Sequence, residues 1–236
     1  MSVYACSDLH DQSNLWQQIQ KYCKPDDKIY FLGDAIDRGC DYLQTMFSLL
    51  KDERVVYIKG NHEQLMETAI KEGIMDNSIT ENSIVWIQNG GYYSLEGLHT
   101  LNKEEFNFLL NRLQQMPYKT IYKNKNGINI HLSHAGETLG TILSNEHYIW
   151  DREHIKDNWN TIKYKNDIVV HGHTPVQLLS DYNKNISEKF YYNPEIIKYS
   201  DEHKIDIDLG SFSSNRIALL NLDTLEPIYF YNKGGK

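Results

Sequence analysis

The sequence predicts an α/β protein in which parallel strands carry polar residues to one edge of a sheet. Three observations support this: short apolar runs of strand length, helix-like segments between the early runs, and Gly, Asp, Asn or His directly after each run. Ligands of open α/β sheets bind at the carboxyl ends of the strands, so we expect the polar clusters to converge there. The five runs are Val3–Cys6, Ile29–Leu32, Val55–Ile58, Ile128–Leu132 and Ile168–Val170.

Helix-like spacing fills the gaps between the early runs. Apolar residues recur every three or four positions in Asn14–Tyr22 and Asp41–Lys51, which predicts helices that let successive strands pair in parallel. Lys103–Gln115 has the same pattern, with Asn102 as N-cap and Glu105 placed to complete a capping box. Further helices, covering a sheet face or the site, are expected at Glu63–Lys71 and Ser83–Asn89.

The pattern changes toward the C-terminus. Apolar residues alternate with aspartates across Ile205–Leu209, and Arg216–Leu222 and Pro227–Tyr231 follow at hairpin spacing. This predicts an antiparallel stretch that closes the sheet system. The segment 176–203 is rich in Tyr, Asn and Lys without clear periodicity, and we interpret it as a surface insertion that borders the cleft, within one domain spanning 1–236.

Composition excludes several classes of protein. The 236 residues are 40% hydrophobic, which is typical of a globular domain and not of a disordered chain. The net charge of −8, with no basic patch, argues against a nucleic-acid partner. No apolar run is long enough for a membrane span or an export signal. Three cysteines, far apart and odd in number, favour a reducing cytoplasm over a disulfide framework.

Acidic residues and histidines follow the first two strands. Asp8 and His10 are one residue apart in a tight loop, where they could equally be a cap and a surface histidine. Asp34, Asp37 and Arg38 lie between glycines after the second strand. One interpretation of this second cluster is a solvated turn that contains an Asp–Arg pair. The other is a metal site, because a strand that ends in Gly-Asp exposes its carboxylate at the edge of the sheet, where a ligand that bridges two metal ions would have to lie.

Amide and imidazole groups follow the later strands. Asn61 and His62 come after the third strand, and an amide oxygen is a good ligand where negative charge must be limited. His134 and His173 each lie among small residues, where a buried structural histidine is the alternative. Together, two aspartates, one asparagine and three histidines fit a pair of divalent ions sharing Asp34, with Mn, Fe or Zn suited to the donors. The set comprises Asp8, His10, Asp34, Asn61, His134 and His173.

These clusters, taken in order, resemble the metal-dependent phosphoprotein phosphatases within the calcineurin-like metallophosphoesterases. The resemblance implies two mixed β-sheets in a central sandwich flanked by helices (α/β/β/α). The segments Ile149–Glu153, Trp86–Gly91 and Ile207–Gly210 are similar to the lambda-type phage and bacterial branch. The matching motifs are Asp8-Leu9-His10, Gly33-Asp34-Ala35-Ile36-Asp37-Arg38-Gly39, Gly60-Asn61-His62-Glu63, His134-Ala135-Gly136 and Gly172-His173-Thr174.

The resemblance also implies roles. Asp8, His10 and Asp34 hold one metal, and Asp34, Asn61, His134 and His173 hold the other. Manganese is the preferred ion, with iron, zinc or nickel as alternatives. His62 is the general acid, Asp37 is hydrogen-bonded to it, and Arg38 and Arg152 clamp the phosphoryl oxygens. A metal-bridging hydroxide attacks phosphorus directly.

The sequence thus favours a phosphomonoester hydrolase acting on phosphoserine and phosphothreonine in proteins or on small phosphomonoesters. Asp37 and Glu63 favour this over the related symmetrical dinucleoside tetraphosphatases, and that comparison also rests on resemblance. Hydrolysis of dinucleoside tetraphosphates or phosphodiesters on the same metals stays open as an alternative. An inactive phosphate-binding module is a third reading, against which the presence of His62 speaks. No nucleic-acid or membrane partner is expected, and the sequence does not indicate an oligomeric state.

Overall fold

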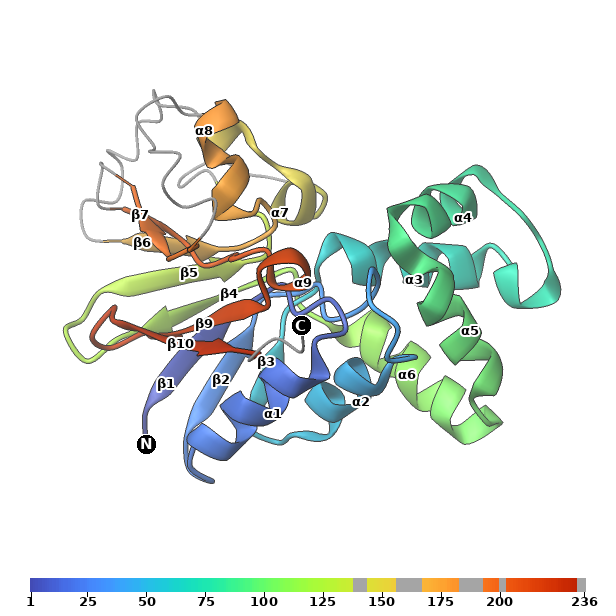
Figure 1. Cartoon of the computed structure of the whole chain (residues 1–236), viewed down its shortest axis with the longest axis horizontal. Helices are drawn as coiled ribbons and strands as arrows, with labels where there is room; N and C mark the ends of the chain where they lie inside the picture. The colour runs from blue at the N-terminus through green and yellow to red at the C-terminus, as the bar shows by residue number, and fades with distance from the viewer. Residues whose placement is uncertain (138–143, 156–166, 183–192, 200–202, 233–236) are drawn as a thin grey trace.

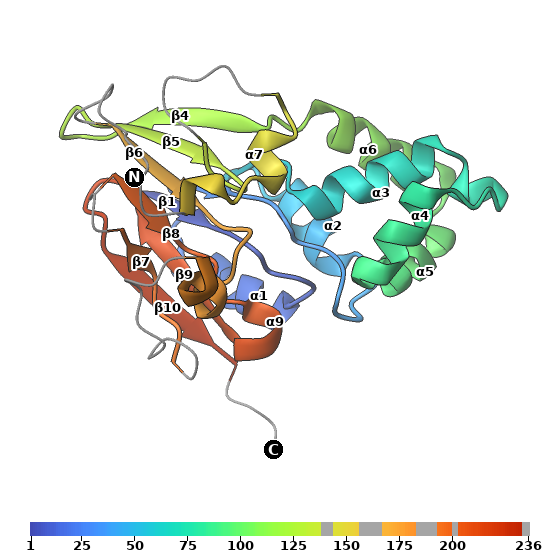
Figure 2. The ribbon, with the colours of Figure 1, turned by 90° about the horizontal axis from the view of Figure 1, so that it is seen from above.

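Two mixed β-sheets face each other at the centre of the molecule, with helices on their outer sides (Figures 1 and 2). The computed structural model describes residues 1–137, 144–155, 167–182, 193–199 and 203–232. The first sheet has the order β10-β9-β1-β2-β3 and the second β4-β5-β6-β8-β7. The predicted sandwich is therefore confirmed.

In the first sheet β1, β2 and β3 pair in parallel, and β9 pairs antiparallel with β1 and with β10. In the second sheet β6 pairs in parallel with β5 and β8, and the outer pairs β4–β5 and β7–β8 are antiparallel. The first sheet consists of β1 (Val3–Cys6), β2 (Lys28–Phe31), β3 (Val55–Tyr57), β9 (Arg216–Asn221) and β10 (Pro227–Tyr231). The second consists of β4 (Lys119–Lys123), β5 (Asn129–Ser133), β6 (Ile168–His171), β7 (Ile197–Lys198) and β8 (Lys204–Asp206).

Alternation along the strands creates separate cores. In β1, Val3 and Ala5 face the second sheet and belong to the core between the sheets, which includes Leu132. Tyr4 and Cys6 face the other way, into a core shared with the helices. Burying the apolar faces of both sheets stabilises the sandwich, at roughly 1.5–3 kcal/mol for each large aliphatic side chain.

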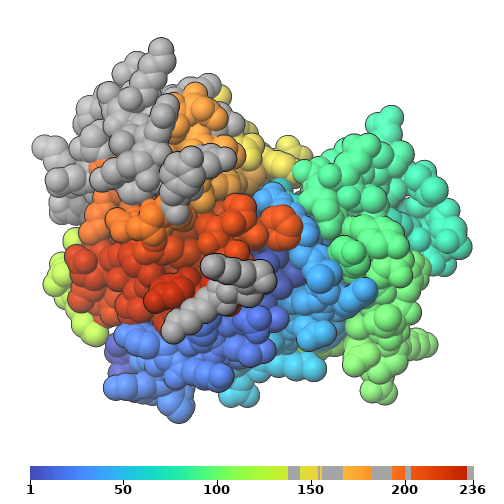
Figure 3. Space-filling view, in the orientation of Figure 1, coloured from blue at the N-terminus to red at the C-terminus, as the bar shows by residue number. Residues whose placement is uncertain are grey.

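Six helices cover the outer face of the first sheet and extend past it. Beyond α1, α2 and α3, the segment 74–115, which contains α4, α5 and α6, forms a lobe beside the sandwich, here called the helical cap (Figure 3). The bounds are α1 (Ser13–Tyr22), α2 (Gln44–Lys51), α3 (Asn61–Lys71), α4 (Glu81–Trp86), α5 (Tyr92–Thr100) and α6 (Lys103–Gln115). Shorter helices are α7 (His147–Trp150), α8 (Leu179–Tyr182) and α9 (Ser211–Ser214). None of the helices in the described ranges is long and apolar enough to cross a bilayer.

The five predicted strands form, and α6 has the predicted bounds with Asn102 and Glu105 in a capping box. The helix expected from Asp41 begins at Gln44, because Tyr42 and Leu43 have positive φ and the Asp41 carboxylate accepts the Thr45 amide. The helix expected at Ser83–Asn89 ends earlier, at Trp86, and a π-helical turn (Ile87–Gly91) follows it. The pattern analysis did not predict β4, α5 or α7.

The C-terminal prediction needs one correction. The hairpin β9–β10 is antiparallel as expected, and β8 pairs antiparallel with β7, but on its other side β8 pairs in parallel with β6, with Val169 opposite Lys204. The alternation of apolar and acidic residues could not reveal this, because the direction of β8 depends on the crossover from β6 rather than on its own residues.

The described ends of the predicted insertion 176–203 are partly buried and contribute β7 to the second sheet. Val176, Leu179 and Ile197 are buried in a small core there, together with Leu209. Residues 183–192 and 200–202 lie outside the described residues. The surface insertion, its place beside the cleft and the single domain therefore stay predictions.

Candidate active site

Loops at the carboxyl ends of strands from both sheets meet at one place. Asp8, Asp34 and Asn61 follow β1, β2 and β3 in the first sheet, whereas His134 and His173 follow β5 and β6 in the second. We expected the polar residues at the edge of one sheet, whereas the loops that carry them come from both sheets. The loops are joined through backbone hydrogen bonds, such as Asp8 N to Gly33 O at 3.0 Å and Gly172 N to His134 O at 2.8 Å. All six predicted ligands are buried.

The backbone of this centre is unusual. Left-handed φ is uncommon for residues other than glycine and is concentrated at functional sites. Here φ lies between 44° and 71° at Asp8, His10, Asp34, Asp37, Arg38 and His173. Gly60 is required for a different reason, since a Cβ there would lie 2.2 Å from Asp34 Oδ1. The loops can therefore approach one another closely enough to place several donors around a common point.

Potential ligand atoms form two groups that share Asp34. The first contains His10, Asp34 and His62, and the second Asp34, His134 and His173, with ligand atoms within 4.8 Å of one another in each. Asp34 Oδ2 is 3.3 Å from His134 Nε2 and 3.8 Å from His10 Nε2. A carboxylate common to both groups is the arrangement needed to bridge two ions.

The hydrogen bonds of the histidines leave electron pairs facing the centre. His10 Nδ1 donates to Ile36 O at 2.8 Å and His134 Nδ1 to Leu32 O at 2.7 Å, because a carbonyl oxygen only accepts. In each ring Nε2 is therefore the nitrogen that faces Asp34, and its electron pair is available to a metal ion once Nε2 is deprotonated.

The second group closes around Asn61. Its Oδ1 is 2.8 Å from His134 Nε2 and 2.9 Å from His173 Nδ1, and these two nitrogens are 3.2 Å apart. Electron-pair donors this close repel each other unless a cation or a proton lies between them. The donors, carboxylate and amide oxygen with imidazole nitrogen, fit a divalent ion of the Mn, Fe or Zn type.

The charges of the side chains in the centre also favour a bound cation or proton. Burial raises the pKa of Asp34, but the imidazoles of His134, His62 and His10 outweigh it and hold the pKa well below its usual range. Burial lowers the pKa of His134, whereas Asp34 and Asp8 raise it, to about 10 overall. A proton would thus occupy the centre in place of a metal, and divalent ions would displace it.

His62 and Asp37 form a buried pair beside this centre. His62 Nδ1 is 2.7 Å from Asp37 Oδ2, the contact that the sequence predicted, and His62 Nε2 is 3.8 Å from Asp34 Oδ2. Burial lowers the pKa of His62, but Asp34 and Asp37 raise it more, so the pKa is above its usual value. The pair can therefore hold a proton that faces the shared carboxylate.

Side chains that the sequence analysis did not assign to the site hold this pair. Trp86 Nε1 donates to Asp37 Oδ2 at 2.9 Å, and Ser94 Oγ donates to Asp37 Oδ1. Both come from the helical cap. Trp86 was noticed only as part of a branch motif, and no local pattern marks Ser94, since the contact spans 57 positions of the chain.

Glu63 has a structural part in the centre. Its carboxylate accepts the amides of Asp34 at 2.8 Å, Ala35 at 2.9 Å and Gly60 at 2.9 Å, and also the Tyr57 hydroxyl at 2.8 Å. One buried side chain thus ties the loop after β2 to the loop after β3.

Asp8 and the arginines lie beside the two groups. Asp8 Oδ2 accepts from Ser7 Oγ and, at 3.1 Å, from the His173 amide, and Asp8 belongs to neither group. Arg38 Nη2 is 3.2 Å from His62 Nε2, and Arg152 Nε donates to Thr174 Oγ1 at 3.2 Å. The ligand role of Asp8 and the phosphate-clamping roles of both arginines stay predictions.

The comparison with protein-family models decides the family. The model for the calcineurin-like phosphoesterases matches residues 1–177. The chain belongs to this family. Members of the calcineurin-like phosphoesterases are metal-dependent hydrolases, and the two groups around Asp34 are the candidate metal sites of this member.

Solved structures of this fold carry different activities. A candidate diadenosine tetraphosphatase is 13% identical with a TM-score of 0.65, covering 99% of this chain and 94% of that chain. A Saccharomyces cerevisiae protein serine/threonine phosphatase similar to human PP5 is 13% identical (TM-score 0.61; 100% and 81% covered). A cold-active protein-tyrosine phosphatase of a Shewanella species is 18% identical (TM-score 0.57; 98% and 77% covered). At these identities the likeness shows the fold alone.

Proposed function

We propose that this calcineurin-like phosphoesterase is a binuclear-metal phosphatase that hydrolyses phosphomonoesters, with phosphoserine and phosphothreonine in proteins as substrates. The observation that carries the proposal is the His62–Asp37 pair, 2.7 Å apart and directed at the carboxylate that both metal groups share. A phosphomonoester of serine has a poor leaving group, an alkoxide, and its departure requires a proton donor at this position.

One set of residues would bind the metal ions. Asp34, His10, Asn61, His134 and His173 would hold two divalent ions, with Asp8 as a further ligand, and manganese is our proposed metal. When bound, the ions supply positive charge to the phosphoryl group and make water a nucleophile at neutral pH.

Other side chains act on the phosphate and the leaving group. Protonated His62 delivers its Nε2 proton to the departing oxygen, and Asp37 keeps the ring oriented through Nδ1. Arg38, whose guanidinium already contacts His62 Nε2, and Arg152 bind the phosphoryl oxygens with their planar forks.

A neighbouring cleft supports a polypeptide substrate. Its volume is about 590 Å³, and Trp150, whose ring centre is 5.9 Å from that of His173, links it to the metal groups. The described residues that line it include amide and hydroxyl side chains and one charged group, Glu146, but no Lys or Arg. A polyphosphate chain would need cations along this path, whereas an extended peptide needs hydrogen-bonding partners and apolar contacts.

Location and partners are also proposals. We place the enzyme in the cytoplasm, since its three cysteines are free and two of them are buried. Its partners are then phosphorylated proteins or small phosphomonoesters of that compartment.

A substrate panel on the manganese-loaded enzyme tests the proposal. It compares a phosphoserine peptide, p-nitrophenyl phosphate, bis-p-nitrophenyl phosphate and diadenosine tetraphosphate by kcat/KM. We expect both monoesters to be hydrolysed and the peptide to be preferred over diadenosine tetraphosphate. A higher kcat/KM for diadenosine tetraphosphate or the diester would contradict the proposal, and Asp181→Asn, an exposed carboxylate on α8, is the control variant.

A further inference from the structure

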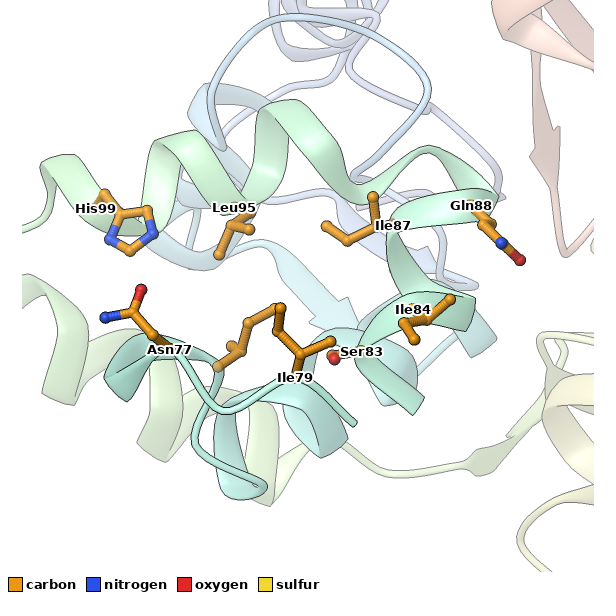
Figure 4. A pocket seen from close by; sticks show the side chains of 9 residues that line it. Asn77, Ile79, Ser83, Ile84, Ile87, Gln88, Leu95 and His99 are labelled. Atoms are coloured by element: carbon orange, nitrogen blue, oxygen red, sulfur yellow. The ribbon is translucent and has the colours of Figure 1, made fainter. Parts of the chain in front are cut away.

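The helical cap contains a second pocket, outside the metal centre. It has a volume of about 430 Å³ and lies between α5 on one side and the segment from Ile74 to α4 on the other (Figure 4). Aliphatic side chains line its two walls: Ile74, Ile79, Ile84, Ile87 and Leu95. Volume and lining are in the range of small-molecule sites, which combine an apolar body with a few polar groups.

Three of the four polar side chains that line the pocket lie at its ends, and the fourth, Ser83, is hydrogen-bonded to Thr80. Asn77 and His99 face each other at one end, and Gln88 lies at the other (Figure 4). Among the residues that the structure describes, no carboxylate, ammonium or guanidinium group lines the space. Between residues 74 and 99 the chain carries three carboxylates, Asp76, Glu81 and Glu96, and no Lys or Arg. An anionic head group would therefore be repelled, and an uncharged ligand is favoured.

Hydrogen bonds brace the wall formed by the 74–84 segment. Thr80 and Ser83 form a capping box at the start of α4, and Glu72 accepts from Thr80 Oγ1 and, at 2.6 Å, from Asn82 Nδ2. Gly73, with φ of 89°, and Asn77, with φ of 61°, set the turns on either side of Ile74. The wall is thus held in place by its own contacts, which makes the pocket a preformed site rather than a gap that apolar collapse would close.

The same elements that line the pocket hold the proton donor of the active site. Trp86, at the end of α4, and Ser94, on α5 next to Leu95, both donate to Asp37, the partner of His62. Between them, Gly90 O accepts the amide of Arg38 at 3.1 Å. The intervening turn (Ile87–Gly91), kinked at Gly90 with a φ of 104°, includes Ile87 and Gln88 of the pocket.

We propose that this pocket binds an uncharged, elongated, mainly apolar small molecule with a hydrogen-bonding group at one end, and that its binding is linked to the Asp37–His62 pair. The pocket is open in the arrangement in which Trp86 and Ser94 hold Asp37. A ligand that fits it therefore favours that arrangement and raises turnover. The linkage rests on the proposed phosphatase function, whereas the binding does not.

Binding is tested with Nile red, an uncharged apolar dye, on the metal-loaded full chain. Ile84→Lys places an ammonium group in the pocket at a side chain that is 44% exposed, and Ile79→Lys does so at one that is 78% exposed, so that folding is preserved in at least the second. Ile121→Lys, on β4 at 52% exposure, is the matched control. We expect saturable binding to the wild type and the control, and binding weaker by about tenfold or more in both pocket variants, because an ammonium group in an apolar space is costly.

Competition tests the chemical class of the ligand. 1-Octanol should displace the dye, and octanoate, which has the same chain length with a charged head, should do so at least about tenfold less well. Equal dye binding in all variants would overturn the site, and equal displacement by octanoate would overturn the uncharged class. Displacement only by an amphipathic helical peptide would also contradict the proposal.

The linkage is measured as kcat for p-nitrophenyl phosphate. Saturating 1-octanol should raise kcat about fivefold in the wild type and Ile121→Lys, toward the lower end of typical coupling between two sites, and leave both pocket variants unchanged. An unchanged kcat at saturation, with dye displacement intact, would refute the linkage. Absence of any hydrolysis both with and without ligand would instead refute the proposed function, and the binding results would still stand.

Discussion

The metal groups and the proton donor belong to one centre but are held by different parts of the molecule. The metal groups rely on the sandwich: Leu32 O and Ile36 O orient two histidines, and Glu63 ties together the loops after β2 and β3. His62 relies on Asp37, which the helical cap holds through Trp86 and Ser94. Strand-end loops thus provide metal affinity, and the cap provides proton delivery.

Because different parts of the molecule provide them, metal affinity and proton delivery can be changed separately. A substitution in the helical cap should lower turnover while metal content stays the same. A substitution of Glu63, which ties together the loops after β2 and β3, should lower metal affinity more than turnover at saturating metal. Variants on each side, and one at the carboxylate that both halves share, therefore test the comparison.

Asp34→Asn should have the largest effect, because it removes the charge common to both metal groups. Metal ions contribute several kcal/mol to stabilising the transition state, so we expect kcat/KM for p-nitrophenyl phosphate to fall by about a thousandfold or more. Metal content per chain, measured alongside kcat/KM, should also fall. Retention of both metals with near-normal turnover would show that Asp34 does not bridge them.

His62→Gln should lower turnover without loss of metal. Removing a general acid costs on the order of a hundredfold to ten-thousandfold, and the loss should be larger for a phosphoserine peptide than for p-nitrophenyl phosphate, whose phenolate leaves more easily. The ratio of the two losses is the informative quantity. An equal loss on both substrates would mean that His62 positions the phosphate and donates no proton.

Glu63→Gln should weaken metal binding by about 10- to 100-fold, as is common for groups that orient metal ligands. The glutamine keeps one acceptor but turns an NH₂ group toward backbone amides that the carboxylate now accepts. Titration of the metal-free protein with manganese gives the affinity. Turnover at saturating manganese should recover most of the wild-type value, and a loss of kcat that manganese cannot restore would place Glu63 in the chemical step.

Trp86→Phe should have the smallest effect, about tenfold or less on kcat, which corresponds to the net contribution of one ordinary hydrogen bond. Trp16→Phe is the matched control, since buried Trp16 donates to Ser48 Oγ at 3.0 Å and not to Asp37. Metal affinity should not change in either variant. Weakened metal binding in Trp86→Phe alone would contradict the separation between cap and sandwich.

Much of the fold could be predicted from the sequence because its strands and helices are locally consistent. Short β-branched runs, three- and four-residue spacing and the Asn102 capping box each depend on neighbours along the chain. The direction of β8 and the start of α2 could not be predicted in this way, because the first depends on a crossover and the second on the Asp41 side chain and two residues with positive φ.

The same distinction between features set by sequence neighbours and features set by distant contacts applies to the site. Asp34, His62, His134 and His173 were found because Gly, Asp, Asn and His directly follow strands, and the structure brings them together. Ser94 was missed because its role depends on a contact with Asp37 across 57 positions, and the part played by Glu63 was missed because backbone amides carry no sequence signal. Supporting groups of this kind become visible only when the packing is known.

The central claim is that two divalent ions meet at Asp34, and anomalous diffraction from manganese-loaded crystals tests it most directly. The account predicts two peaks that both contact the Asp34 carboxylate, one of them also near His10 and the other near Asn61, His134 and His173. A lone peak, or peaks that Asp34 does not touch, would contradict it.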